Sequence, residues 1–265
     1  MKADNQLRKR QLYIFFILSY VIFWILLGLT GLAISLNVPQ RFETVLKNIC
    51  AWAPTFAVLI LFKKLYPDKT LPQLIKDNFS QKIKWQTITY ILVIQIAVYL
   101  LAVLSCTIFN NVEISSLTFI QPSAILPAFI VTLTSGPIGE ELGWRGFAYN
   151  EFRRKFTLLK SAVILGILWG VWHLPLWILS GYTGADLIIY IITFMISITA
   201  LSILISLFYD KQRNLFIPIL MHFLFNFLLK IVSIDVISVL IYTSVFYTAA
   251  VVIFLLLRRT ADKVN

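Results

Sequence analysis

The chain has 265 residues, of which 59% are hydrophobic and only 13% charged, and its mean hydropathy is +0.85. Soluble domains contain roughly 45–50% apolar residues, so this composition excludes an ordinary soluble protein. The formal net charge of +11 does not indicate a nucleic-acid partner, because the basic residues lie in short runs beside apolar stretches. We therefore expect an integral membrane protein whose surroundings are membrane lipids.

Eight apolar stretches follow one another along the chain, each long enough to cross a hydrocarbon core of ~30 Å as a helix. They are residues 13–36, 46–62, 87–109, 122–150, 159–180, 186–208, 215–231 and 236–257. The longest connection, residues 63–86, holds 24 residues and leaves no room for a second, soluble domain. The sequence thus predicts one integral membrane domain over residues 1–265, an all-α polytopic membrane helix bundle with about eight transmembrane helices.

Basic residues are distributed unequally between the two sides that eight spans define. With the N-terminus in the cytoplasm, 19 of the 23 Lys and Arg fall in cytoplasmic segments and three in outer loops. Cytoplasmic loops are enriched in Lys and Arg, so we expect a multi-pass protein of the cell membrane with both termini cytoplasmic. The first stretch is too long for a signal-peptide core, and we expect it to be retained.

The two cysteines, Cys50 and Cys106, are too few for a thiolate metal cluster, and no C-x-x-C motif occurs. A disulfide is conceivable because both lie near the outer ends of their spans. Unpaired, buried thiols are the simpler expectation.

A few charged or titratable side chains fall inside the predicted spans: Glu140, Glu141, Arg145, His173, His222 and, one turn after the last, Asn226. A charge in hydrocarbon costs at least ~2.5–3.5 kcal/mol, so such a set needs pairing, water or a function. Glu141 precedes Arg145 by four residues, the order and spacing of an intrahelical ion pair. Glu140 points ~100° away on the helix and is expected to lack a partner of its own, which makes it the candidate reactive carboxylate.

The polar residues are predicted to lie at a similar depth. At ~1.5 Å per helical residue, Glu140, His173 and Asn226 lie ~18–20 Å from the inner boundary, and His222 lies at ~12 Å. Residues 135–139 interrupt the fourth span with Ser, Pro and two Gly, and such breaks are tolerated only where the backbone faces protein or water. We interpret this arrangement as a water-filled chamber inside the bundle.

Aromatic residues accompany both histidines. Trp169 and Trp172 precede His173, and Phe223 follows His222. These rings are candidates for an apolar substrate groove, although ordinary packing explains them equally well.

Three motifs follow one another in the order Glu140-Glu141-x-x-x-Arg145, Trp169-x-x-x-His173 and His222-x-x-x-Asn226. In these motifs the chain resembles the CAAX-protease and bacteriocin-processing family of intramembrane endopeptidases, also called the CPBP or Abi family. The family pattern is E-E-x-x-x-R, F-x-x-x-H and H-x-x-x-N or D on successive helices. The resemblance covers residues 120–230, which would form the catalytic core. Trp169 replaces the usual Phe, an exchange of one aromatic ring for another.

The resemblance implies proteolysis at the membrane. Glu140 and His173 would activate a water molecule for attack on a peptide carbonyl. His222 and Asn226 would stabilise the oxyanion that forms. The ion pair four residues apart in the fourth span would hold the helix and the site in place.

The role of a metal is open from the sequence, so the cofactor is either none or one zinc ion. Glu140, His173 and His222 could hold zinc with an open fourth position, as in several hydrolytic zinc sites. The two histidines differ in depth by ~8 Å, however, and Asn226 beside His222 supplies a donor suited to an oxyanion. Direct activation of water is therefore the favoured interpretation.

Two other functions are compatible with the pattern. A noncatalytic immunity or regulatory scaffold would keep the same fold without turnover. A proton-coupled transporter would use the acids and histidines as a relay, but the first three spans hold no comparable polar residues.

The substrate class follows only indirectly. Eukaryotic relatives cut prenylated protein C-termini, whereas a short, basic, eight-span chain is typical of bacteria. Peptide pheromones, bacteriocin leaders or membrane-protein tails are therefore the expected peptide substrates, with a role in self-immunity as one outcome.

Overall fold

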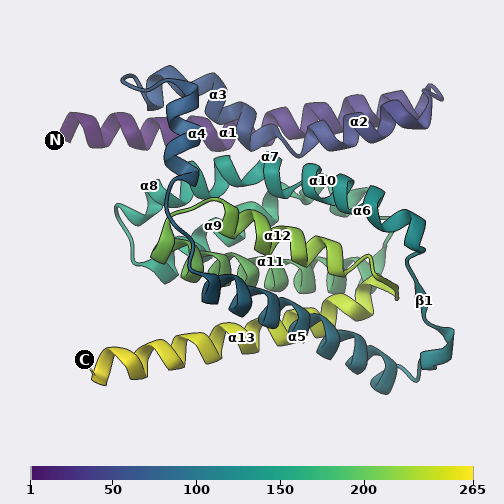
Figure 1. Ribbon diagram of the computed structural model, residues 1–265. Helices are drawn as coiled ribbons and strands as arrows, with labels where there is room; N and C mark the ends of the chain where they lie inside the picture. The colour runs from purple at the N-terminus through teal and green to yellow at the C-terminus, as the bar shows by residue number, and fades with distance from the viewer. Residues whose placement is uncertain (1, 265) are drawn as a thin grey trace. The chain divides into compact units, whose positions relative to one another are not determined.

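The computed structural model describes residues 2–264, and the chain is almost entirely helical (Figure 1). Its elements are α1 (Lys2–Ser35), α2 (Gln40–Cys50), α3 (Ala53–Leu65), α4 (Leu71–Phe79), α5 (Trp85–Phe109), η1 (Ile114–Ser116), β1 (Thr118–Phe119), α6 (Pro122–Thr134), α7 (Pro137–Glu141), η2 (Leu142–Tyr149), α8 (Asn150–Arg153), α9 (Leu158–Trp172), α10 (Leu174–Ile178), α11 (Gly184–Gln212), α12 (Phe216–Leu228), β2 (Val232–Ser233) and α13 (Val236–Val264).

The helices group into two compact units, each assembled from three separate segments of the chain. The first unit comprises Met1–Lys82, Leu126–Thr157 and Tyr209–Phe223. The second comprises Ile83–Ile125, Leu158–Phe208 and Leu224–Asn265.

In the first unit, α2 and α3 return along α1 and are bent by 54° relative to each other (Figure 1). The bend falls where Pro54 stands in the first turn of α3, because proline lacks the N–H that would continue the preceding helix. Helix α3 also packs against α7 and η2. Phe15 of α1 contacts Trp144 and Phe147 of η2 edge to face, with ring centroids 5.7 and 5.0 Å apart. The first unit therefore fixes the segment that carries the acidic motif.

In the second unit, α5 packs alongside α13, and the Tyr247 hydroxyl donates to Gln95 Oε1. Helix α9 approaches α11 closely at Gly166, where a Cβ would lie 2.8 Å from Thr199 Cα. The only sheet among the described residues is the antiparallel pair of β1 and β2, with Thr118 opposite Ser233.

Five helical segments in the described part of the chain are long and apolar enough to cross a membrane, and the bent pair α2–α3 would make six. The five are Gln6–Ser35, Trp85–Phe109, Pro122–Arg153, Gly184–Gln212 and Val236–Arg259. This confirms the all-α polytopic membrane bundle. Each predicted stretch falls on one helix or on consecutive helical elements, but α9 and α12 have only 15 and 13 residues, so the number eight stays a prediction. Both cysteines are free and buried, as expected.

Candidate active site

The acidic motif begins at a break in the fourth apolar stretch. Helix α6 ends at Thr134 and α7 begins at Pro137, and Glu140 N donates to Gly136 O at 2.8 Å. Proline suits the first turn of a helix because its missing N–H would have no partner there. Helix α7 continues into η2, a π-helix, a rare geometry that is frequent at functional sites. The predicted interruption before the acidic pair is confirmed.

Trp52, at the bend between α2 and α3, closes this break. Its Nε1 donates to the carbonyl oxygen of Thr134, the last residue of α6, at 2.9 Å. A Cβ on Gly139 would lie 2.7 Å from Trp52 Cδ1, and one on Gly143 would lie 2.5 Å from Pro54 Cβ. Only glycine permits this approach, so the bend of α2–α3 sets the position of the acidic helix. The sequence analysis did not identify Trp52.

Glu141, Arg145 and His222 form a buried polar cluster. Arg145 Nη1 donates to both carboxylate oxygens of Glu141, at 2.8 and 2.9 Å, which confirms the predicted ion pair. His222 Nδ1 lies 2.9 Å from Glu141 Oε1. The side chains of Glu141 and Arg145 are fully buried and that of His222 is 5% exposed. If one member of the cluster were removed, water would therefore solvate the remaining charge poorly. The first and third motifs therefore meet at Glu141.

Glu140 has a hydrogen-bond donor on its own helix, so the expectation that it lacks a partner was wrong. Trp144 Nε1 donates to Glu140 Oε2 at 3.0 Å, across the same four-residue spacing that joins Glu141 to Arg145. The indole stacks on Phe16 of α1, with ring centroids 6.0 Å apart. A neutral donor lowers the cost of burying the carboxylate without adding a positive charge.

His173 lies in the second unit, at the break between α9 and α10. Its Nδ1 is 2.8 Å from the carbonyl oxygen of Trp169. A carbonyl oxygen only accepts, so Nδ1 carries the proton and Nε2 of the neutral ring carries the lone pair. Trp172 and Phe194 contact the imidazole edge to face, with centroids 4.9 and 5.1 Å away. This environment gives the ring a defined tautomer and orientation.

Asn226 follows His222 by one turn of α12 and therefore lies on the same helical face. The two units divide α12 after Phe223, so Asn226 belongs with His173 in the second unit. The structure thus brings Glu140, Glu141, Arg145 and His222 together in the first unit. That His173 and Asn226 complete the same site remains a prediction.

The three groove candidates are buried. Trp169 and Trp172 are each 1% exposed and Phe223 is 6% exposed, with the Phe223 ring 4.6 Å from that of Phe129. Their burial favours a packing role, and their place in a substrate groove stays a prediction.

Among the side chains that the structure describes, no three or more His, Cys, Asp or Glu form a group that could hold a metal ion. The zinc set of Glu140, His173 and His222 divides between the two units, so zinc stays a prediction, and the bond of His222 Nδ1 to Glu141 is compatible with a ligand role for Nε2. The chemistry below is written for the favoured metal-free alternative, with the side chains alone.

Comparison with known proteins agrees with the motifs. Residues 122–228 match the family model described as Rce1-like, type II CAAX prenyl endopeptidase. The chain is also 28% identical over 213 residues to a protein of Methanococcus maripaludis named CAAX prenyl protease 2, covering 77% of this chain and 78% of that protein.

With the polytopic helical fold, these matches identify an intramembrane protease. Both matches support the resemblance of the three motifs to the CAAX-protease and bacteriocin-processing family of intramembrane endopeptidases.

Proposed function

We propose that the protein hydrolyses a peptide bond in a membrane-associated or leader-type peptide with a water molecule activated by Glu140 and His173. The observation that carries the proposal is the contrast between two adjacent carboxylates. Glu141 is neutralised by the bidentate guanidinium of Arg145, whereas Glu140 accepts from the neutral indole of Trp144. Paired acids in different environments are typical of sites in which one acid is structural and the other reacts.

In the proposed mechanism, Glu140 accepts a proton from water while His173 Nε2 orients that water. The hydroxide attacks the scissile carbonyl, and a tetrahedral oxyanion forms. The Glu140 carboxyl group then returns the proton to the leaving amine. Glu140 therefore acts first as a base and then as an acid.

His222 and Asn226 are the proposed oxyanion donors. The carboxylate of Glu141 only accepts, so His222 Nδ1 donates to it, and Nε2 carries a proton only when the ring is an imidazolium. In this proposal His222 carries both ring protons throughout the cycle, so no further proton is needed when Nε2 and the Asn226 amide donate to the oxyanion. Each such donor is typically worth about 3–4 kcal/mol in the transition state.

The substrate proposal is limited to peptides that reach the membrane. The relative's name refers to a CAAX prenyl tail, and a bacteriocin leader is the second class to test. The basic residues favour cytoplasmic termini, so we propose that such peptides enter from the cytoplasmic side.

The test uses protein purified in detergent and two peptide sets, prenylated CAAX tails and unprenylated leader peptides, with products identified by mass spectrometry. We expect cleavage of at least one set, unchanged after dialysis against a strong chelator. Loss of activity that stoichiometric zinc restores would contradict the metal-free mechanism. Equal activity in His173→Ala would contradict the assignment of His173.

A further inference from the structure

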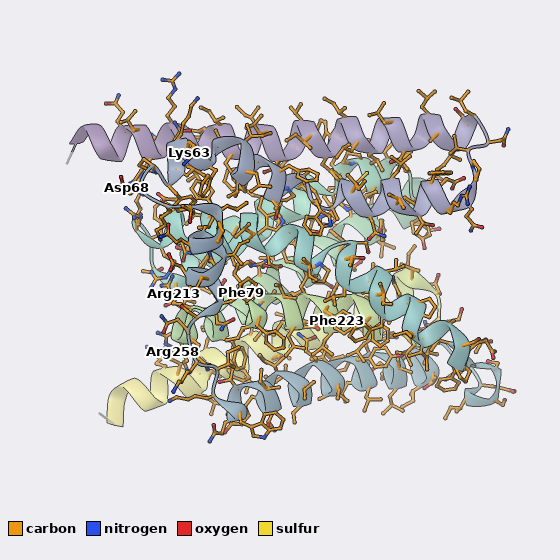
Figure 2. All side chains as sticks on the ribbon, turned by 45° about the horizontal axis from the view of Figure 1, so that its top comes forward. Lys63, Asp68, Phe79, Arg213, Phe223 and Arg258 are labelled. Carbon is orange, nitrogen blue, oxygen red and sulfur yellow. The ribbon has the colours of Figure 1, made fainter. Side chains whose placement is uncertain are left out.

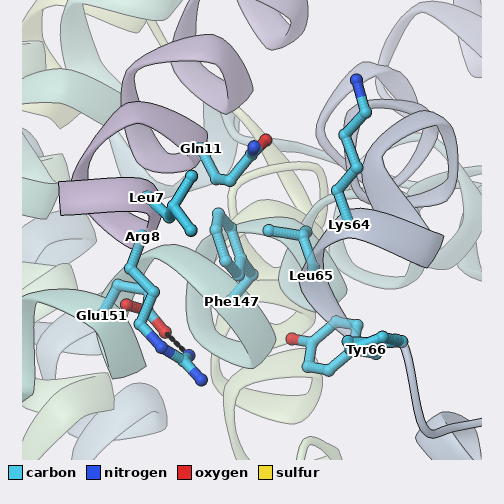
Figure 3. A pocket seen from close by; sticks show the side chains of 9 residues that line it. Leu7, Arg8, Gln11, Lys64, Leu65, Tyr66, Phe147 and Glu151 are labelled. Carbon is cyan, nitrogen blue, oxygen red and sulfur yellow. Dashed lines mark hydrogen bonds and ion pairs between the residues drawn. The ribbon is translucent and has the colours of Figure 1, made fainter. Parts of the chain in front are cut away.

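Two adjoining cavities of about 400 and 520 Å³ open at one end of the first unit. They share Arg8, Tyr66, Phe147 and Glu151 as lining residues and are together called the basic pocket here. Figure 3 shows its smaller half, with α1 on one side, the end of α3 on the other and Phe147 of η2 between them.

The basic pocket lies where membrane spans begin or end. Its lining comes from the start of the Gln6–Ser35 span, from the residues that follow α3, from the end of the Pro122–Arg153 span and from the end of the Gly184–Gln212 span. In Figure 2, Lys63, Asp68 and Arg213 gather at this end of the first unit, whereas Phe223 lies farther along it. The ends of spans mark the boundary between hydrocarbon and water, which is the level of lipid headgroups.

The pocket carries an excess of positive charge. Its larger half is lined by five cationic and two acidic side chains: Arg8, Lys69, Arg153, Arg154, Arg213, Asp77 and Glu151. Asp210 lies behind this lining, and counting it still leaves five cations against three carboxylates. An anion entering the recess would therefore be attracted to it.

Shared carboxylates hold the guanidinium groups in place. Asp210 accepts from Arg153 at 3.1 Å and from Arg213 at 2.7 Å. Glu151 accepts from Arg8 at 3.3 Å and from Arg154 at 3.4 Å. Each carboxylate thus holds two guanidinium groups in a fixed orientation but neutralises only one positive charge. Guanidinium groups held in this way are the preferred partners of phosphate oxygens.

The smaller half of the pocket has an apolar wall that a soluble anion would not need. Leu7, Leu65, Pro67 and Phe147 form this wall beside the charged groups. Burial raises the pKa of Tyr66 to about 12, so its hydroxyl keeps its proton at neutral pH and can donate to a phosphate oxygen. The charged wall is complementary to the headgroup of a phospholipid, and the apolar wall is complementary to its glycerol region.

We infer that the basic pocket binds the headgroup phosphate of an anionic phospholipid. The site is distinct from Glu140 and His173, and its occupation does not depend on proteolysis. Because Gly146 and Phe147 of η2 line the pocket, the bound lipid would contact the helix that continues from the acidic motif.

The test is native mass spectrometry of delipidated protein in a neutral detergent, titrated with phosphatidylglycerol or with phosphatidylcholine of the same acyl chains. We expect the first phosphatidylglycerol molecule to bind with a Kd at least about tenfold lower than that of the first phosphatidylcholine molecule. In the double variant Lys69→Gln, Arg154→Gln that preference should fall at least about tenfold, since each basic residue near an anionic headgroup contributes about fivefold. Both side chains are about half exposed, so their replacement should not disturb folding.

Two control variants and a competition with inorganic phosphate make the result decisive. Lys76→Gln, Lys82→Gln removes the same charge from exposed positions outside the pocket and should retain the preference. Lys69→Arg, Arg154→Lys conserves charge and should also retain it. Equal binding of the two lipids, or equal losses in the pocket variant and the outside variant, would overturn the proposal. Complete displacement of phosphatidylglycerol by millimolar inorganic phosphate would also overturn it, because the occupant would then be a soluble anion.

Discussion

Glu140→Gln is expected to lower kcat for peptide cleavage by about 10²–10⁴-fold, the usual contribution of a general base. Glutamine has nearly the same size and can still accept from Trp144 Nε1, so the helix should remain folded. The measurement is kcat and KM of the purified variant on a cleaved peptide, with the amount of protein in the membrane fraction as the folding check.

The matched control is Glu113→Gln, which makes the same exchange at an exposed carboxylate. It should leave kcat within about twofold of the wild type, as is usual for surface substitutions. Wild-type kcat in Glu140→Gln would contradict the assignment of Glu140 as the base.

Arg145→Ala is expected to lower the amount of folded protein rather than the chemistry of each molecule. The substitution leaves the buried carboxylate of Glu141 without its bidentate partner, and breaking a buried pair in this way costs about 3–5 kcal/mol. The measurement is abundance in the membrane fraction together with the unfolding temperature in detergent.

Two other arginine variants separate charge from geometry. Arg145→Lys keeps the charge without the planar fork and should restore part of the unfolding temperature. Arg41→Ala removes an exposed charge from α2 and should change abundance little. An Arg145→Ala variant with wild-type abundance and unfolding temperature would show that the ion pair does not support the fold.

The helical class could be predicted because hydropathy and charge act over whole segments. The number of spans stays a prediction, since local breaks divide two of the predicted stretches into shorter helices. The fifth predicted stretch divides at His173, with Pro175 in the first turn of the next helix, which leaves α9 with 15 residues. The second predicted stretch is split by the bend before Pro54, which no average over a window registers.

The candidate site was predictable where its contacts are local. The pair of Glu141 and Arg145 follows from their spacing on one helix. The bond from Trp144 to Glu140 has the same spacing and was overlooked, because a tryptophan in a span is taken as apolar although its indole donates one hydrogen bond.

Contacts between distant segments were beyond the sequence. His222 meets Glu141 across 81 positions, and Trp52 meets Thr134 across 82. Neither segment carries a periodic pattern that specifies its partner, so packing alone decides these contacts.

The central claim is that Glu140 and His173 act on the same water molecule, and a double-mutant cycle tests it most directly. The measurement is kcat/KM of the wild type, Glu140→Gln, His173→Ala and the combined variant on one peptide. Residues that act as a unit are strongly non-additive, so the combined variant should be no more than about threefold slower than the slower single variant. A combined loss equal to the product of the two single losses would mean that the residues act independently and would contradict the account.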